Sequence, residues 1–188
     1  MNLDEIRLEN DRVSLLPLSR THVGNLLPIA LQKGLIRYSP SKIDSEEDLA
    51  AYVSNALVQR EQKTAIPFLV LDKRSGNTAG CTRFMNIDWD NRVVHIGSTW
   101  IGREFQGTGL NTEMKRLMID FAFGELHFEK IEFRIDERNT PSRKAVEKLG
   151  AVLEGILRRN VYLTDGFKRD TCCYGLFPTE WEKARRSL

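Results

Sequence analysis

The amino-acid sequence predicts an α+β fold in which helices pack on a mostly antiparallel central sheet. Segments with strand and helix periodicity follow one another in the order strand, helix, helix, three strands, helix, strand, helix, two strands. A strictly alternating order would instead predict a doubly wound parallel sheet. The chain has 188 residues, of which 41% are hydrophobic and 29% are charged. These values fit one compact globular unit, so we expect a single domain over residues 1–188.

The N-terminal third is predicted to form one strand and two helices. Residues 11–18 (DRVSLLPL) have the pattern of a strand, and Ser19 is placed to cap a helix over about residues 20–32. Ser45 precedes three acidic residues, which are favourable in the first turn of a second helix. Apolar residues then recur at helical spacing, at Leu49, Tyr52, Val53 and Leu57.

The middle of the chain is predicted to form three strands and a helix. Residues 65–87 read as two strands joined by a tight turn at residues 75–77 (SGN), which is a hairpin signal. Residues 92–101 (RVVHIGSTWI) are rich in β-branched side chains and predict the third of these strands. Residues 109–125 predict a helix with one core-facing stripe, formed by Leu110, Met114, Leu117, Met118 and Phe121.

The C-terminal third is predicted to add three strands and two helices. Residues 130–137 (KIEFRIDE) alternate apolar and charged side chains, as in a strand with one buried face. Residues 139–150 (NTPSRKAVEKLG) predict a short helix with Thr140 as its N-cap. Two strands follow around the turn at residues 164–167 (TDGF), and PTEW at residues 178–181 begins a terminal helix.

Composition and charge exclude several classes of function. Lys and Arg exceed Asp and Glu by two, without a long block of like charge, so nucleic acid is not expected as a partner. Cys81 and the adjacent pair Cys172 and Cys173 provide neither a disulfide framework nor zinc-site spacing, so no metal is expected. The chain starts with acidic residues rather than an apolar leader, and no stretch approaches the roughly 20 apolar residues that span a bilayer. We therefore expect a cytoplasmic protein without a membrane partner.

A glycine-bearing loop lies between a predicted strand and the helix at residues 109–125. Gly107 and Gly109 stand one residue apart in EFQGTGLNTEMK, and the first N–H groups of the helix have no partner within it. Such a loop suits an anion, especially phosphate, although glycines also serve tight turns that bind nothing. The loop lacks the lysine of a Walker A motif, and Thr112 stands where the dinucleotide fingerprint requires a third glycine.

Four segments in this order resemble one enzyme family. QGTGLN at residues 106–111 resembles the acyl-CoA loop of the GNAT N-acetyltransferases, and residues 139–159 (NTPSRKAVEKLGAVLEGILRR) resemble the segment that follows in that family. The start at residues 11–23 (DRVSLLPLSRTHV) and the end at residues 166–181 (GFKRDTCCYGLFPTEW) are similar to those of the RimJ/RimL-like branch. The resemblance covers nearly the whole chain.

The resemblance implies where the acyl donor acetyl-CoA would bind. Its pantetheine arm would lie in a gap where the fourth and fifth predicted strands, residues 92–101 and 130–137, splay apart. Main-chain groups of the fourth strand would pair with the arm, and N–H groups of the glycine loop would hold the pyrophosphate. Asn139 is either a cofactor contact or an amide that bridges two backbone segments. The implied binding residues are Trp100, Ile101, Gln106, Gly107, Thr108, Gly109, Leu110, Asn111, Asn139 and Ser142.

Two residues are candidates for proton chemistry. His95 stands where many RimJ/RimL-like proteins have a glutamate, and an imidazole with an ordinary pKa of about 6.5 could accept the proton of an ammonium. Asp88 and Asp90 are alternative bases in the preceding loop. The position of the family's thiolate-protonating tyrosine is Val146, so that donor is absent. Ser142 is the hydroxyl expected near the sulfur, or else it satisfies N–H groups in the first helical turn.

The sequence thus predicts transfer of an acetyl group from acetyl-CoA to a primary amine by direct attack, without a metal or a covalent enzyme intermediate. The acceptor is a small-molecule amine or a protein N-terminus, and a homodimer is left open. A non-catalytic acyl-CoA sensor is the alternative, because the family's tyrosine and glutamate are both replaced. A nucleotide-binding regulator is a third interpretation.

Overall fold

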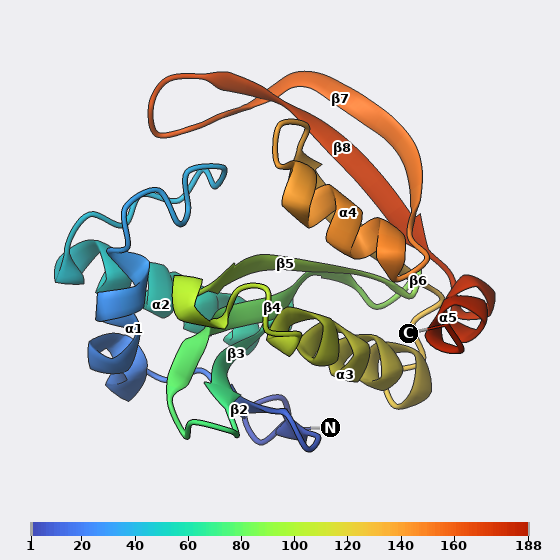
Figure 1. Ribbon diagram of the computed structural model, residues 1–188, viewed down its shortest axis with the longest axis horizontal. Coiled ribbons are helices and arrows are strands. Elements are labelled where there is room, and N and C mark those ends of the chain that lie inside the picture. Colours follow the sequence, from blue (N-terminus) through green and yellow to red (C-terminus); the bar gives the residue numbers. More distant parts are fainter. Residues whose placement is uncertain (1, 188) are drawn as a thin grey trace.

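Within residues 2–187, eight strands form one sheet in the order β1-β2-β3-β4-β5-β6-β8-β7, and helices cover both of its faces (Figure 1). This computed structural model describes residues 2–187. The strands are β1 (Leu8–Glu9), β2 (Val13–Pro17), β3 (Ile66–Asp72), β4 (Thr78–Asp88), β5 (Val93–Ile101), β6 (Lys130–Asp136), β7 (Val152–Tyr162) and β8 (Lys168–Leu176). The helices are α1 (Val23–Ala30), α2 (Glu46–Glu61), α3 (Leu110–Gly124), α4 (Thr140–Lys148) and α5 (Pro178–Arg185), with 3-10 turns at Arg20–His22 and Arg103–Phe105.

Among the strands of the described residues, β5 and β6 are the one parallel pair, and they are joined over only a short stretch. Their register consists of Val93↔Lys130, Val94↔Ile131 and His95↔Glu132. β5 then continues to Ile101 and β6 to Asp136 without further pairing, while β4 and β8 pair with their outer edges. β5 and β6 are the fourth and fifth predicted strands, so the expected mixed, mostly antiparallel and splayed sheet is confirmed.

Two hydrophobic clusters hold the helices on opposite faces of the sheet. On one face, α3, α4 and α5 bury a large cluster against the strands, including Met114, Met118, Phe133, Tyr174 and Trp181. On the other face, α1 and α2 bury a smaller cluster that contains Leu26, Leu49, Val53 and Trp100. Because each helix presents one apolar stripe, packing on the sheet removes these side chains from water and orients both elements. No helix in residues 2–187 has the length and apolar character needed to cross a bilayer.

The local sequence signals predicted most element boundaries correctly. The start and end of the first helix and the short strand β1 differ from the prediction. Ser45 caps α2, since its hydroxyl accepts a hydrogen bond from the Asp48 N–H at 3.1 Å. The helix expected over residues 20–32 begins instead with a 3-10 turn, and α1 ends two residues after Pro28, which has no N–H for the helical ladder. Strand β1 was not predicted because two residues are too few to show alternation.

The predicted N-cap of α4 was wrong by one residue. Asn139, rather than Thr140, is the cap, because its side-chain oxygen accepts from the Ser142 N–H at 3.3 Å. Thr140 is the first helical residue, and Pro141 follows it within the first turn. An asparagine carbonyl reaches the third helical N–H as readily as a threonine hydroxyl, so the two neighbouring positions compete for this role.

One cation lies in the core between α3 and β6. Lys115 is 7% exposed, and its ammonium lies 5.6 Å from the centroid of the Phe133 ring. Burial lowers the pKa of Lys115 to about 8, and no acidic group within residues 2–187 opposes that shift. The protonated amine is therefore a destabilising group in the folded protein.

We expect Lys115→Met to raise the free energy of unfolding at pH 7 by on the order of 2–3 kcal/mol. Between pH 8 and about 10 the unfolded chain binds the lysine proton that the folded protein has lost, so the penalty in the wild type fades as pH rises. The advantage of the variant should shrink accordingly in urea titrations at pH 7 and 9.5. Exposed Lys144→Met is the control, and a pH-independent advantage for Lys115→Met would contradict the expectation.

Candidate active site

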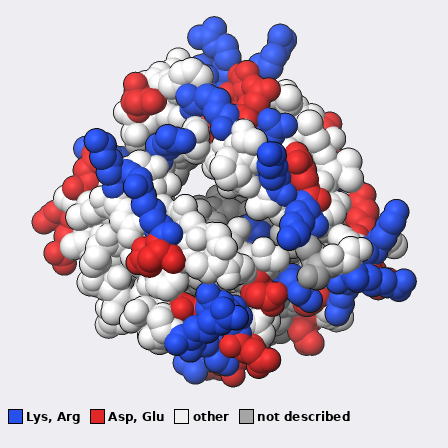
Figure 2. Space-filling model, in the orientation of Figure 1, with Lys and Arg blue, Asp and Glu red and all other residues white. Residues whose placement is uncertain are grey.

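The gap between β5 and β6 opens directly after His95 and Glu132, the last paired residues. Figure 2, in the orientation of Figure 1, shows a hollow bordered by β5, α4 and the connection between α1 and α2. The connection is held near its start and at its middle. The Gln32 side-chain oxygen accepts from the Arg103 N–H at 2.9 Å, and the Tyr38 main-chain carbonyl accepts from Arg169 Nη1 at 2.8 Å. Segments far apart in the sequence thus enclose this hollow.

The glycine loop stands at the open end of the gap, between β5 and α3. Gly107 and Gly109 have φ values of +73° and +86°, a left-handed region that other residues rarely adopt, and Gly109 is the N-cap of α3. Both are exposed, and a Cβ added to either would meet no atom within 4 Å. The loop is therefore shaped by its glycines without being covered by other parts of the chain.

Four successive backbone N–H groups of this loop donate no hydrogen bond to any residue in 2–187. They belong to Gly107, Thr108, Gly109 and Leu110. Free N–H groups at a helix N-terminus carry partial positive charge and commonly bind phosphate. Asn111, at the position of the family's small residue, is half-buried in the first turn of α3. This cluster of donors is the main feature that an anionic ligand could use.

The three other predicted contacts before the loop are engaged with the protein itself. The Gln106 N–H donates to the Arg103 carbonyl at 3.1 Å, and its side-chain amide donates to the Ile101 carbonyl at 2.9 Å. The Trp100 carbonyl oxygen abuts Gly80 of β4, where an added Cβ would lie only 2.0 Å away. The Trp100 carbonyl therefore points to β4 rather than into the gap, and the Ile101 carbonyl is already engaged by the Gln106 side chain.

A β-bulge in β5 explains this change of direction. Ser98 has a φ of +47°, and the register between β4 and β5 shifts opposite it. A bulge inserts an extra residue into one strand, which re-aims the backbone groups on either side. The Ser98 carbonyl points to the α2 face, where it accepts from the Tyr52 hydroxyl at 3.5 Å. A serine in a β-branched strand carries no signal of a bulge, so sequence reasoning missed it.

His95 and Glu132 form a charged contact at the closed end of the gap. His95 is 9% exposed, and its Nε2 lies 3.0 Å from Glu132 Oε2. Burial lowers the pKa of His95, the Glu132 carboxylate opposes this shift, and Arg134 and Lys130 reinforce it. The pKa of Glu132 is also lowered: burial would raise it, but the hydrogen bond from Lys130 and the nearby cations outweigh that effect. The site thus favours a neutral imidazole beside a carboxylate.

Both nitrogens of this imidazole already have partners. Nδ1 lies 3.2 Å from the side-chain amide of Asn86, while Nε2 contacts Glu132. A neutral ring that donates to Glu132 and accepts from Asn86 has no free lone pair. The His95–Glu132 pair, rather than the imidazole alone, is therefore the proton-accepting unit that this geometry offers. Sequence reasoning named His95 but missed Glu132 and Asn86.

The alternative bases lie at the other end of β5. Asp88 accepts hydrogen bonds from the Asn91 N–H and side-chain amide at 2.9 and 2.8 Å, which lower the pKa of its carboxyl group. Asp90 is exposed in the same turn. This turn precedes Val93, the first paired residue of β5, whereas the gap begins beyond His95. The structure therefore separates Asp88 and Asp90 from the gap.

The N-terminal end of α4 supplies a free hydroxyl. Ser142 is half-buried, and its side-chain oxygen forms no hydrogen bond among residues 2–187, although its N–H donates to Asn139. Val146, one turn later, is 2% exposed and belongs to the core. No group of three His, Cys, Asp or Glu side chains in residues 2–187 is arranged to hold a metal ion.

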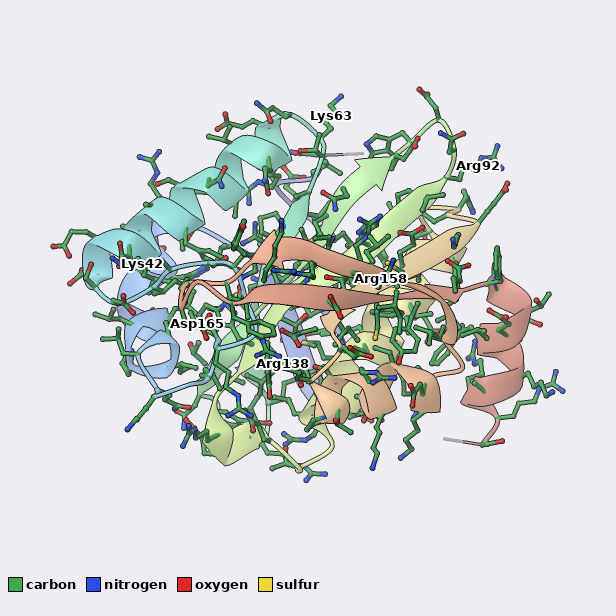
Figure 3. All side chains as sticks on the ribbon, turned by 90° about the horizontal axis from the view of Figure 1, so that it is seen from above. Lys42, Lys63, Arg92, Arg138, Arg158 and Asp165 are labelled. Carbon is green, nitrogen blue, oxygen red and sulfur yellow. The ribbon has the colours of Figure 1, made fainter. Side chains whose placement is uncertain are left out.

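A second hollow lies beyond the end of β6, beneath the turn between β7 and β8. Its volume is about 440 Å³. Arg138 forms a two-point contact with Asp136, at 3.0 and 2.8 Å, and its guanidinium stacks 3.8 Å from the Phe167 ring centroid. Figure 3 looks onto the β7–β8 hairpin and shows Asp165 at its turn and Arg158 along it. The hollow is lined by Asp136, Glu137, Arg138, Arg159, Tyr162, Gly166, Phe167, Lys168 and Asp170.

Comparison with known proteins agrees with this geometry. YdaF of Bacillus subtilis, a proposed ribosomal N-acetyltransferase, is 35% identical over 107 residues, which cover 57% of each chain. The ribosomal-protein-serine acetyltransferase of Escherichia coli is 26% identical over 130 residues, covering 68% of this chain and 70% of that one. The match thus spans little more than half of the first relative.

Solved structures and a family model extend the match over most of the chain. A GCN5-related N-acetyltransferase from Brucella melitensis superposes with a TM-score of 0.88 at 25% identity, over 100% of this chain and 85% of that one. The family model described as an acetyltransferase (GNAT) domain matches residues 12–152. The relatives named for ribosomal acetylation support the RimJ/RimL-like branch. The chain belongs to the GNAT acetyltransferase family.

Proposed function

We propose that the protein transfers the acetyl group of acetyl-CoA to a primary amine by direct attack of the amine on the thioester. The four unpartnered N–H groups at the start of α3 carry this proposal, because they offer a diphosphate site beside the gap between β5 and β6. Beyond His95 and Glu132 the inner edges of the two strands are unpaired, so an extended arm would find backbone groups to pair with there. Acetyl-CoA supplies an already activated acyl group, so positioning contributes much of the acceleration.

The chain's own residues would then divide the remaining work. The loop from Gly107 to Leu110 binds the diphosphate through its N–H groups. The His95–Glu132 pair receives the proton that the attacking ammonium must lose. The free hydroxyl of Ser142 donates a hydrogen bond toward the departing sulfur, and Asn139 supports it by capping α4. These four roles are proposals.

The acceptor stays open between two kinds of amine. The relatives include a ribosomal-protein-serine acetyltransferase and a spermidine N(1)-acetyltransferase of Escherichia coli, the latter 27% identical over 93 residues. The hollow beneath the β7–β8 turn combines acidic, basic and aromatic side chains, which suits neither kind exclusively. A single domain over residues 1–188, a cytoplasmic location and a homodimer also stay predictions.

A non-catalytic acyl-CoA sensor is the second candidate. It is favoured by the occupied imidazole of His95 and by the apolar, buried side chain of Val146. A sensor needs the diphosphate loop but has no use for a proton acceptor at the end of the gap. The two candidates therefore differ in chemistry rather than in acetyl-CoA affinity.

An assay with a panel of amine acceptors distinguishes the acetyltransferase from the sensor. We expect acetyl-CoA to release free thiol in the presence of at least one member of a panel of polyamines, amino acids and peptides with free N-termini. Mass spectrometry of the product should show one added acetyl group on a primary amine. Tight acetyl-CoA binding without thiol release for any member would favour the sensor.

Gly109→Val tests the diphosphate loop. Valine is strained at a φ of +86°, and its side chain would fill the open space beside the free N–H groups. We expect acetyl-CoA to bind at least about tenfold more weakly, which corresponds to roughly 1.4 kcal/mol. Gly166→Val is a matched control, because Gly166 also has a positive φ, of +82°, and open surroundings, but lies in the β7–β8 turn. Equal acetyl-CoA affinities in the two folded variants would rule out the loop assignment.

The pH dependence of kcat tests the His95–Glu132 pair. His95→Ala should lower kcat by on the order of 100-fold below the pKa of the acceptor amine, where deprotonation is required. Because the Glu132 carboxylate raises the pKa of His95 and Arg134 lowers it, Glu132→Gln should move the acidic limb of the profile to lower pH and Arg134→Gln to higher pH. A packing role for His95 would be indicated by two results together. The loss of kcat in His95→Ala would be uniform across pH, and the acidic limb would stay at the wild-type pH in both Glu132→Gln and Arg134→Gln.

A further inference from the structure

Thr108, between the two left-handed glycines, ties the loop to the body of the protein. Its hydroxyl donates to the Phe105 carbonyl at 2.7 Å and accepts from Arg12 Nη2 at 3.2 Å. The side chain therefore turns back toward the protein, while the Thr108 N–H is one of the four free donors. Arg12 reaches this loop from the start of β2, 96 positions earlier in the chain.

Arg12 itself is held firmly in a buried position. It is 9% exposed and forms an ion pair with Asp72 of β3, which is 4% exposed. Asp72 is fixed in turn, because its Oδ2 accepts from the N–H and hydroxyl of Ser75 at 3.2 and 2.8 Å. The planar guanidinium offers several donors in fixed directions, so one edge can hold Asp72 while Nη2 reaches Thr108.

A second contact joins the same part of the chain to α3. The Asn10 side-chain amide lies 3.4 Å from Glu113 Oε2, in the first turn of the helix. The side-chain oxygen of Asn10 also accepts from the Arg12 and Val13 N–H groups, both at 2.9 Å. The turn before β2 thus contacts both the loop and the helix that follows it.

A loop with two glycines and four free N–H groups has much conformational freedom to lose when it binds a ligand. Fixing the backbone of one residue costs roughly 1–2 kcal/mol. A loop that is already ordered in the free protein avoids part of that loss, which is why preorganisation raises affinity. The Arg12–Thr108 contact can order the loop from its protein-facing side, where Arg12 does not touch the ligand.

We propose that Arg12 is a positioning residue for the acyl donor. Through Thr108 it holds the loop from Gly107 to Leu110 with its free N–H groups turned outward, where the diphosphate of acetyl-CoA would bind. This role rests on the proposed function.

Two conservative substitutions test this positioning role without leaving the buried Asp72 carboxylate unpaired. Thr108→Val keeps the branched shape and loses the hydroxyl, whereas Arg12→Lys keeps a cation for Asp72 and loses Nη2. Each should raise the acetyl-CoA Kd, measured by calorimetry, about five- to tenfold. The KM for acetyl-CoA should rise in step, while the KM for the amine stays near the wild-type value. Thr108→Ser should restore most of the affinity because it keeps the hydroxyl.

The double variant separates positioning from general damage. If both changes break the same contact, Arg12→Lys combined with Thr108→Val should bind acetyl-CoA no more weakly than the worse single variant. Hydrogen exchange of the loop in the ligand-free protein should speed up in both single variants. Arg92→Lys is the control, since Arg92 makes an exposed ion pair with Glu129 at 2.8 Å.

The outcomes distinguish this proposal from the proposed function. If the wild type binds acetyl-CoA but the single variants bind it equally well, the positioning role alone is overturned. Additive losses in the double variant would also overturn it. A wild type without measurable affinity for acetyl-CoA would overturn both proposals. Binding without thiol release would leave the positioning role standing and remove only the catalytic one.

Discussion

The divergence of β5 and β6 is the constraint on which the rest of this structure depends. Two parallel strands that pair over three positions and then separate leave unpaired backbone groups along both inner edges. Unpaired N–H and C=O groups are tolerated where water or a ligand can reach them, but not in a dry core. β4 and β8 pair with the outer edges, so each strand keeps its place in the sheet although its inner edge is open.

The two ends of the gap offer different chemistry. At the open end, the N-terminus of α3 presents neutral N–H donors whose partial charges suit an anion. At the closed end, a histidine and a glutamate share a partly buried environment between two cations, Lys130 and Arg134. The donors at the start of α3 depend only on backbone geometry, whereas the His95–Glu132 pair depends on the pKa values of both side chains. Substitutions can therefore alter one end of the gap without the other. A binding protein and an enzyme could therefore share the same loop.

The bulge at Ser98 shows how a small backbone change redirects the surface of the gap. A regular strand would present alternate residues of β5 to β6, and the motif alone suggested Trp100 and Ile101 for that role. The extra residue instead directs the Trp100 carbonyl to β4, and Gln106 occupies the Ile101 carbonyl. The main-chain groups available to a ligand are thus set by the register with β4, which lies on the far side of the strand.

The sequence by itself determined the features that depend on neighbouring residues. Ser45 caps α2, Gly107 and Gly109 permit left-handed backbone angles, and the alternation in KIEFRIDE marks one buried face of β6. In each case the physical cause acts within a few residues, so the pattern is visible in the sequence. Only the tertiary structure decided which of those residues meet. His95 and Glu132 are separated in the sequence by α3 but lie opposite each other on neighbouring strands. Arg12 contacts Thr108 although 96 positions separate them. In both cases the order and register of the strands bring the two residues together. Long-range packing also placed the bulge and the buried Lys115, for which adjacent residues carry no signal.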